Sequence, residues 1–301
     1  MGRLINKVKE LFGNSDIVKS IIGVNVFLFL LTGVLNLVAY LFNIELFSIA
    51  DYAKLPASLT LLSRTPWSIF TYMFIHLDVL HLLFNMLFFY WFGQFFLRFF
   101  SSKHLRGLYV LGGLIGGIFF ITSYHIFPIL KGNLHFVSLM GASAAVMAVV
   151  IAVATQAPNQ TIRFLLLGSI KLKYIALFVV ASALLMIPKD NPGGQLAHLG
   201  GALAGFLFVR LLAKGVDLTR WINAVLDIPF AIQHFMTRRK QKMKVVKDNT
   251  KFTKHKQDHD YNYNKKKQSE EIDHILDKIK ETGYENLSEE EKQTLFNARN
   301  K

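Results

Sequence analysis

Four polar residues interrupt the apolar stretches of this 301-residue chain, and their types are those that acyl-transfer chemistry needs. Ser143 carries a hydroxyl, which becomes a nucleophile only when a base takes its proton. His81 and His198 are the candidate bases. Asn85 follows His81 by four residues, so the two side chains would share one face of a helix and supply two donors to an oxyanion. The set predicts a serine nucleophile that uses one of the two histidines as its base.

Each residue also has a plainer structural interpretation. A lone serine in an apolar helix usually bonds to its own backbone, and the His–Asn pair would serve equally as a polar clamp between helices. Small residues favour the chemical interpretation. Ser143 lies in the segment 141–145 (GASAA), and His198 is followed by Gly201 and Gly205 at helical spacing. The helix that carries His198 is therefore expected to pack closely against the segment around Ser143.

The stretches that hold these residues are long and apolar enough to cross a membrane. Hydrophobic residues make up 52% of the chain and charged residues 18%, and the absence of cysteine excludes a disulfide scaffold or a Cys-ligated metal site. A bilayer core needs about 20 mostly apolar residues per helix. Six segments qualify: 20–42, about 80–100, about 106–125, about 140–155, about 172–187 and about 194–213. We predict an all-α, polytopic membrane protein whose domain 20–213 is a six-transmembrane-helix bundle.

The distribution of basic residues predicts the orientation of this bundle. Six spans place both termini on the same side of the membrane, and lysine and arginine are enriched on the cytoplasmic side. Ten basic residues fall in the N-terminal segment 1–19 and in the loops after spans two and four, against four in the remaining loops. Both termini are therefore expected in the cytoplasm.

Two segments next to the spans have amphipathic patterns. Residues 43–79 mix apolar pieces with charged residues, which fits a partly embedded loop better than a soluble domain. Residues 214–235 pair Trp221 and Val225 with charged residues, which is typical of an interfacial helix on the cytoplasmic leaflet. Pro229 is expected to end or kink that helix.

The C-terminal tail divides by charge. Residues 236–267 carry a net charge of +9, and residues 268–301 carry −4. The basic part is predicted to be a flexible linker or a segment that attaches to anionic lipid. It does not favour nucleic-acid binding, because no folded module accompanies the charge. Residues 268–301 are expected to form a small helical hairpin, broken at Gly283 and restarted by the capping box of Ser288 and Glu291.

The ordered motifs resemble those of the rhomboid intramembrane serine proteases over about residues 15–213. The matching residues are His76, His81, Phe84 and Asn85 in HxxxxHxxFN, Gly141 and Ser143 in GxSx, and Ala197, His198, Gly201 and Gly205 in AHxxGxxxG. Trp67 also fits the family's aromatic position before the second span. Each motif is short, but their ordered combination is specific.

The resemblance implies a role for each matching residue. Ser143 would be the nucleophile, and His198 its general base and then general acid, in a dyad without an aspartate. His81, Asn85 and the backbone N–H of Ser143 would form the oxyanion hole. Gly141 would give the backbone the freedom to enter the fourth span abruptly.

Three positions depart from the family's pattern. Ser68 follows Trp67 where many rhomboids have arginine, and Ala144 stands in the small-residue positions after the nucleophile, where glycine is common. Met147 occupies a position that is often aromatic and stacks under the catalytic histidine. A methionine side chain is flexible, so it should orient the imidazole less well than a ring would.

The resemblance implies a bacterial inner-membrane serine endopeptidase of the six-span type. Its partners would be single-span membrane proteins, cut near the outer surface and needing no metal or organic cofactor. One alternative is a non-proteolytic rhomboid-like chaperone or dislocation factor that binds transmembrane segments. Another is a transporter with His81 and His198 as relay groups, which is weakened because no acidic residue lies deep in any span.

Overall fold

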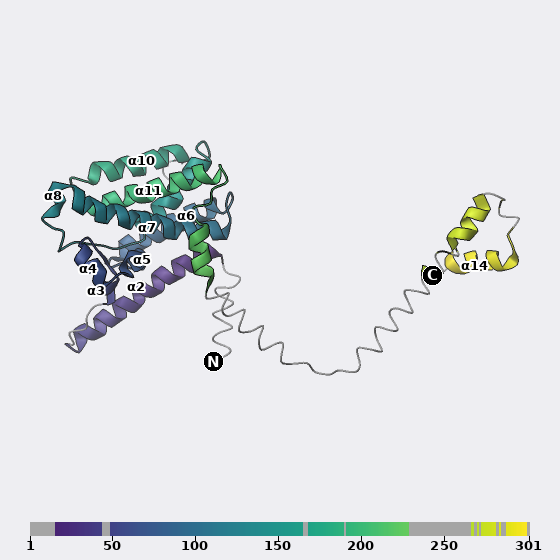
Figure 1. Cartoon of the computed structure of the whole chain (residues 1–301), viewed down its shortest axis with the longest axis horizontal. Coiled ribbons are helices and arrows are strands. Elements are labelled where there is room, and N and C mark those ends of the chain that lie inside the picture. The colour runs from purple at the N-terminus through teal and green to yellow at the C-terminus, as the bar shows by residue number, and fades with distance from the viewer. Residues whose placement is uncertain are drawn as a thin grey trace. The chain divides into compact units, whose positions relative to one another are not determined.

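The computed structural model describes residues 16–43, 49–164, 168–189 and 191–228, and in the tail 266–267, 270, 272–280, 283 and 287–299 (Figure 1). The chain forms two compact units, 1–230 and 231–301. The predicted segments 1–19 and 214–235 are described only in part. The basic segment 236–267 lies outside the described residues except for its last two.

The first unit is built from apolar helices. Four are long enough to cross a membrane: α2 (Ile17–Leu41), α6 (Val79–Phe96), α7 (Ser102–Ile126) and α11 (Pro192–Leu212). Two shorter ones are α9 (Ser143–Gln156) and α10 (Leu172–Met186). These helices confirm a polytopic, mostly helical membrane protein, although only four of the six predicted spans are long enough to cross a membrane among the described residues.

The connecting segments contain short elements. They are α3 (Ile49–Ala53), β1 (Leu55–Pro56), α4 (Leu59–Arg64), α5 (Ser68–Thr71), the 3-10 helix η1 (Tyr72–Phe74), α8 (Pro128–Lys131), β2 (Ser138–Leu139), β3 (Thr161–Phe164) and β4 (Gly168–Lys171). β1 pairs with β2 and β3 with β4, both antiparallel. The prediction of an all-α fold was wrong on this point. It missed the two strand pairs because strands of two and four residues leave little periodicity in a sequence.

Helix α9 is held between α7 and α11 by glycines. A Cβ atom on Gly201 or Gly205 of α11 would overlap backbone oxygens of α9, and one on Gly112 or Gly116 of α7 would overlap its alanine methyl groups. Small residues allow such close approach, which drives helix association where lipid offers no hydrophobic contrast. The expected contact between the His198 helix and the Ser143 segment is therefore present.

The length of α9 limits where its ends can lie. Its 14 residues span about 21 Å at 1.5 Å per residue, whereas the hydrocarbon core is about 30 Å thick. On its own, α9 is therefore shorter than the hydrocarbon core is thick. Ser143 is the first residue of this helix.

The segment before Ser143 is tied to the segment that precedes α6. Leu55 pairs with Leu139 in the β1–β2 ladder, and the N–H of Gly141 donates to the carbonyl of Tyr72 at 2.9 Å. The Tyr72 hydroxyl in turn donates to the carbonyl of Gly113 on α7 at 2.6 Å. These bonds position the chain that enters α9.

A helix over residues 220–228 packs against the start of α7. The side chain of Arg106 donates to Asn223 at 2.7 Å and also to Asp227, and this second hydrogen bond holds the pKa of the Asp227 carboxyl below its usual range. Trp221 and Val225 are more than half exposed, while Ile222 is buried. The helix thus has one exposed face with apolar side chains and one buried face, which agrees with the amphipathic helix that the sequence predicts.

The second unit contains a helix over residues 272–280 and α14 (Glu289–Arg299). Ser288 and Glu291 exchange hydrogen bonds at 2.8 and 3.2 Å, which is the predicted capping box. Lys278 of the first helix contacts the Glu291 carboxylate at 2.7 Å. The two helices are therefore linked around the buried Ile275 and Leu287.

Gly201→Ala should lower the stability of the bundle, because the added methyl group would overlap the carbonyl of Ala144. We expect a loss of about 1–3 kcal/mol, the usual cost of overpacking. Gly33→Ala in α2 is the matched control, since a Cβ there has no neighbour within 4 Å. It should be neutral or gain up to about 1 kcal/mol. Thermal unfolding in detergent measures both, and equal melting temperatures would contradict the α9–α11 packing.

Candidate active site

Ser143 and His198 meet at the contact between α9 and α11. The Oγ of Ser143 lies 2.7 Å from Nε2 of His198, although the residues are 55 positions apart in the sequence. This is the distance of a strong hydrogen bond, and it is within the range that a nucleophile and its base would need. Both side chains are half-buried. Of the two candidate bases, the structure brings His198, and not His81, into hydrogen-bond distance of Ser143.

Gln195 contacts the other nitrogen of the His198 ring. Its Oε1 lies 3.3 Å from Nδ1 of His198, one helical turn earlier on α11. A carboxamide oxygen only accepts, so this contact favours the tautomer that carries the ring proton on Nδ1. Nε2 is then free to accept the Ser143 hydroxyl proton. Gln195 was not among the residues predicted from the sequence, although its position three residues before His198 places both on one helix face.

A cavity of about 220 Å³ opens beside this pair. Its lining includes all four polar residues singled out from the sequence together with Met147: His81, Asn85, Ser143, Met147 and His198. Asn85 donates one amide proton to the carbonyl of His81 at 2.9 Å. Its other proton has only a long contact, 3.5 Å, with Nε2 of His76. Asn85 therefore keeps a donor that a ligand in the cavity can use.

Gly141 lets the chain pass against the His81 ring. Its φ is +109°, a conformation that residues with a Cβ rarely adopt. A Cβ there would lie 2.7 Å from Cε1 of His81. Glycine therefore serves two needs at this position, the turn into α9 and the close approach of the imidazole.

His76 is a buried residue that joins the two sides of the site. Its Nε2 accepts a hydrogen bond from the N–H of Ala142 at 3.2 Å, and its ring meets the His81 ring edge-on at 5.2 Å. It thereby fixes the residue just before Ser143 relative to α6. The sequence motif named His76, but its partner Ala142 is visible only in the fold.

The N-terminus of α9 faces the site without a capping side chain. No described protein group accepts a hydrogen bond from the N–H of Ser143. Free N–H groups and the positive end of the helix dipole favour an anion at this place. The arrangement therefore offers donors to negative charge beside the Ser143 hydroxyl.

The remaining predicted positions lie around this centre. Trp67 donates from Nε1 to the carbonyl of Tyr52 at 3.0 Å, and Ser68 is fully buried at the start of α5. Gly201 supports the site through the α9–α11 contact. Among the described residues, no three histidine, aspartate or glutamate side chains lie together in a way that could hold a metal ion.

Comparison with known proteins places this helical bundle in a family. A model of the rhomboid domain matches residues 63–215, which is half of the chain and includes every residue of the site. The chain belongs to the rhomboid family. This rhomboid therefore carries the Ser143–His198 pair inside its family domain, and the resemblance inferred from the motifs is confirmed at the level of the family.

One relative and one further family match extend the comparison. RHOMBOID-like protein 12, mitochondrial, from Arabidopsis thaliana is 28% identical over 157 residues, covering 49% of this rhomboid and 47% of the plant protein. This rhomboid thus spans about half the length of that relative. Residues 256–297 match a family of unknown function (DUF6576), which covers most of the second unit.

Gly141→Ala should destabilise the domain and displace His81, because the methyl group would meet the ring and the positive φ would be strained. We expect a cost of about 1–3 kcal/mol. Gly132→Ala is the control, because that glycine has a negative φ and open space around it. Thermal unfolding compares the two. Equal melting temperatures would show that the Gly141 turn does not need glycine.

Proposed function

We propose that this rhomboid is an intramembrane serine endopeptidase that cleaves membrane-protein substrates with a Ser143–His198 dyad. The 2.7 Å contact between Ser143 Oγ and His198 Nε2 carries the proposal. A serine hydroxyl in an apolar helix normally bonds to its own backbone. Here it instead faces an imidazole whose other nitrogen has its own partner, which is the arrangement of an activated nucleophile.

The reaction follows from the positions of these groups. His198 removes the Ser143 proton as Oγ attacks the scissile carbonyl, and the charge develops on the carbonyl oxygen. The second amide proton of Asn85, the His81 ring and the N–H of Ser143 are the donors proposed for that oxyanion. His198 then gives the proton to the leaving amine, and water hydrolyses the acyl-enzyme by the reverse sequence.

The walls of the cavity indicate the kind of substrate. Phe84 and Phe88 of α6 and Val179 of α10 line it together with the polar groups. Such a surface suits an apolar peptide that has unwound locally from a transmembrane helix. We therefore propose single-span membrane proteins as substrates, with a small residue before the cut, as the family resemblance implies.

The proposed membrane arrangement has six spans and cytoplasmic termini, in a bacterial inner membrane. In this arrangement the shorter apolar helices α9 and α10 would be the remaining two spans. Ser143 begins α9, so the short helix would place the site below the outer surface but within reach of water. The 220–228 helix would lie on the cytoplasmic leaflet, and the basic segment 236–267 would lead to the small unit at 268–301.

Ser143→Ala and His198→Ala should each reduce cleavage of a model transmembrane substrate by about 10⁶-fold, the order seen when a serine protease loses its nucleophile or base. Ser182→Ala is the matched control, because Ser182 bonds only to its own helix, at Val179. Cleavage is measured with purified protein in liposomes. Substrate binding without cleavage by the unmodified protein would favour the chaperone or dislocation function.

Asn85→Ala should lower kcat by about 10²–10³ and change KM little, because an oxyanion donor acts only in the transition state. Steady-state kinetics with the same substrate separate the two constants. If KM rises and kcat holds, Asn85 is a clamp between helices and takes no part in the reaction.

The proposed orientation is tested by reporter fusions. Fusions after Lys19, Lys103 and Lys301 should report the cytoplasm, and a fusion after Lys54 should report the outside, as the distribution of basic residues requires. An enzymatic reporter active on only one side of the membrane gives the measurement. A cytoplasmic signal at Lys54 would show that α2 does not span.

A further inference from the structure

A groove separate from the Ser143 cavity lies between α6 and strand β3. It has a volume of about 640 Å³, and Tyr90, Trp91, Phe95 and Arg98 line one side while Ile162 and Arg163 line the other. We name it the α6–β3 groove. Its lining combines aromatic rings with two guanidinium groups, a composition that the proposed proteolysis does not use.

The two arginines have no carboxylate partner among the described residues. Neither Arg98 nor Arg163 forms an ion pair with any residue in the described part of the chain. Arg98 lies over the Phe95 ring at 4.4 Å, which holds the cation beside the groove. Lys171 pairs with Thr161 in the β3–β4 ladder, so a third cation lies on the face of the hairpin that carries Thr161 and Arg163.

One carboxylate lies close to this cluster. Asp16 caps the start of α2 and accepts a hydrogen bond from Gln94, a lining residue of the groove, at 2.6 Å. Both oxygens of the Asp16 carboxylate thus already accept hydrogen bonds, one from the start of α2 and one from Gln94. Among the described residues named here, the balance at the groove is positive, with two lining arginines and Lys171 against Asp16.

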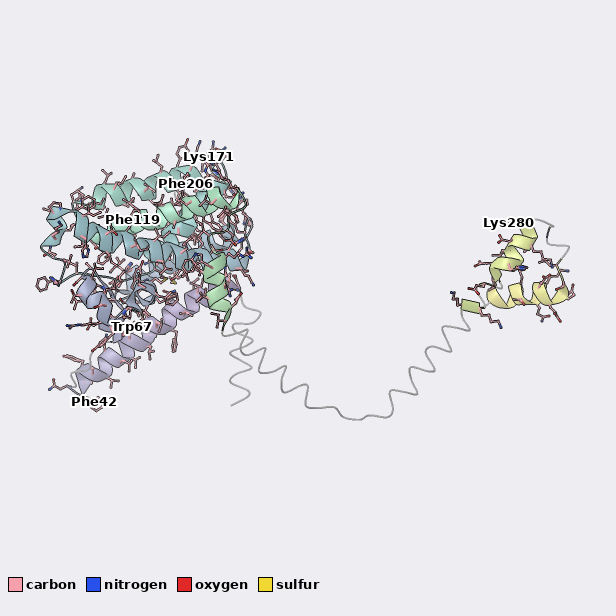
Figure 2. The ribbon with its side chains drawn as sticks, viewed as in Figure 1. Phe42, Trp67, Phe119, Lys171, Phe206 and Lys280 are labelled. Atoms are coloured by element: carbon pink, nitrogen blue, oxygen red, sulfur yellow. The ribbon has the colours of Figure 1, made fainter. Side chains whose placement is uncertain are left out.

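The groove lies at the end of the bundle away from Ser143. His81, beside the catalytic pair, and Gln94, in the groove, are about 20 Å apart along α6 at 1.5 Å per residue. β3 follows the C-terminal end of α9, whereas Ser143 begins that helix. Figure 2 shows Lys171 at the end of the domain opposite Phe42, which follows α2. The groove is therefore at the end where α2 begins.

We propose that the α6–β3 groove binds the headgroup of an anionic phospholipid. Guanidinium groups pair with phosphate through two parallel hydrogen bonds. The half-exposed Tyr90 and Trp91 suit the interface, where aromatic rings lie beside headgroups, and Phe95 and Ile162 offer apolar surface to the start of an acyl chain. A lipid fits this combination better than a free inorganic anion, because a free anion has no apolar part that could contact the aromatic rings.

The test titrates the purified full-length protein in detergent with phosphatidylglycerol or phosphatidylcholine of equal chain length, and counts bound lipid by native mass spectrometry. Arg98→Gln/Arg163→Gln should weaken phosphatidylglycerol binding about 30-fold, as expected for two basic residues at an anionic headgroup. Arg163→Gln alone, on an exposed strand, should weaken it about fivefold without a change in melting temperature.

Arg210→Gln is the matched control, since Arg210 also lies over a ring, that of Phe206, near the C-terminal end of α11 but does not line the groove. It should leave binding unchanged. All variants keep the same basic tail, so differences between them report on the groove. Unchanged binding in the double variant, equal binding of phosphatidylcholine, or displacement of the lipid by an equal concentration of inorganic phosphate would each overturn the proposal.

A different observation carries a second inference, which rests on the proposed proteolysis. We infer that Gln195 is the positioning residue that fixes the tautomer and direction of the His198 ring, through its 3.3 Å contact with Nδ1. Met147 contributes a flexible thioether to the same cavity and holds a ring less firmly than an aromatic side chain. The Oε1 atom of Gln195 on α11 restricts the orientation of the His198 ring in place of an aromatic side chain.

Gln195→Ala should lower kcat about tenfold and leave KM unchanged, while Gln195→Glu, which restores an acceptor, should recover most of the rate. ¹⁵N NMR of histidine-labelled protein reads the tautomer directly, and Gln195→Ala should add a population with the proton on Nε2. Gln156→Ala at the far end of α9 is the control.

Unchanged tautomer populations in Gln195→Ala would overturn the assignment. The NMR measurement needs no turnover, so it separates failure of this inference from failure of the protease assignment.

Discussion

The hydrogen bond between Ser143 and His198 depends on how closely two helix backbones approach each other. The two residues sit on α9 and α11, and their side chains are short relative to an ordinary helix separation of 8–10 Å. A Cβ atom on Gly201 or Gly205 would overlap backbone atoms of Ala144 or Ala148, so glycine at both positions lets α11 approach α9 this closely. In lipid, where apolar burial provides no net driving force, this packing also stabilises the bundle. The same glycines therefore support both the fold and the site.

Several hydrogen bonds hold the chain that enters α9. The segment 137–142 is held by the β1–β2 pairing, by Tyr72 through Gly141 and by His76 through Ala142. The partners of this segment all lie before α6 in the sequence. The same bonds therefore help to position His81 and Asn85, which α6 carries. Donors fixed in this way need no reorganisation when charge develops, which is where electrostatic catalysis gains most. The hydrogen-bonded turn and the donors beside it together make the cavity a candidate oxyanion site.

Much of this arrangement could be predicted from the sequence because lipid penalises polar side chains so strongly. Ser143, His81, Asn85 and His198 were conspicuous in apolar stretches, and the structure brings all four to one cavity. The helices were predictable from the length of the apolar runs. The choice of His198 over His81 as the partner of Ser143 followed only from the family resemblance, since both histidines have the right chemistry.

Other features had no signal of comparable strength. The two-residue strands β1 and β2 are too short to show periodicity, yet they hold the chain that enters the site. The contact of His76 with a backbone N–H depends on where a loop passes, which residue types do not specify. Gln195 was overlooked because a glutamine at a helix start is ordinary until its neighbour is known to be a base.

The most direct test of the account is to map where a fluorophosphonate probe reacts. The probe forms a covalent bond only with a serine whose hydroxyl is activated by a base. Peptide mapping by mass spectrometry after labelling the purified protein should find the adduct on Ser143 alone, and His198→Ala should remove it. An adduct on another serine, or no adduct on a folded protein, would contradict the claim that His198 activates Ser143.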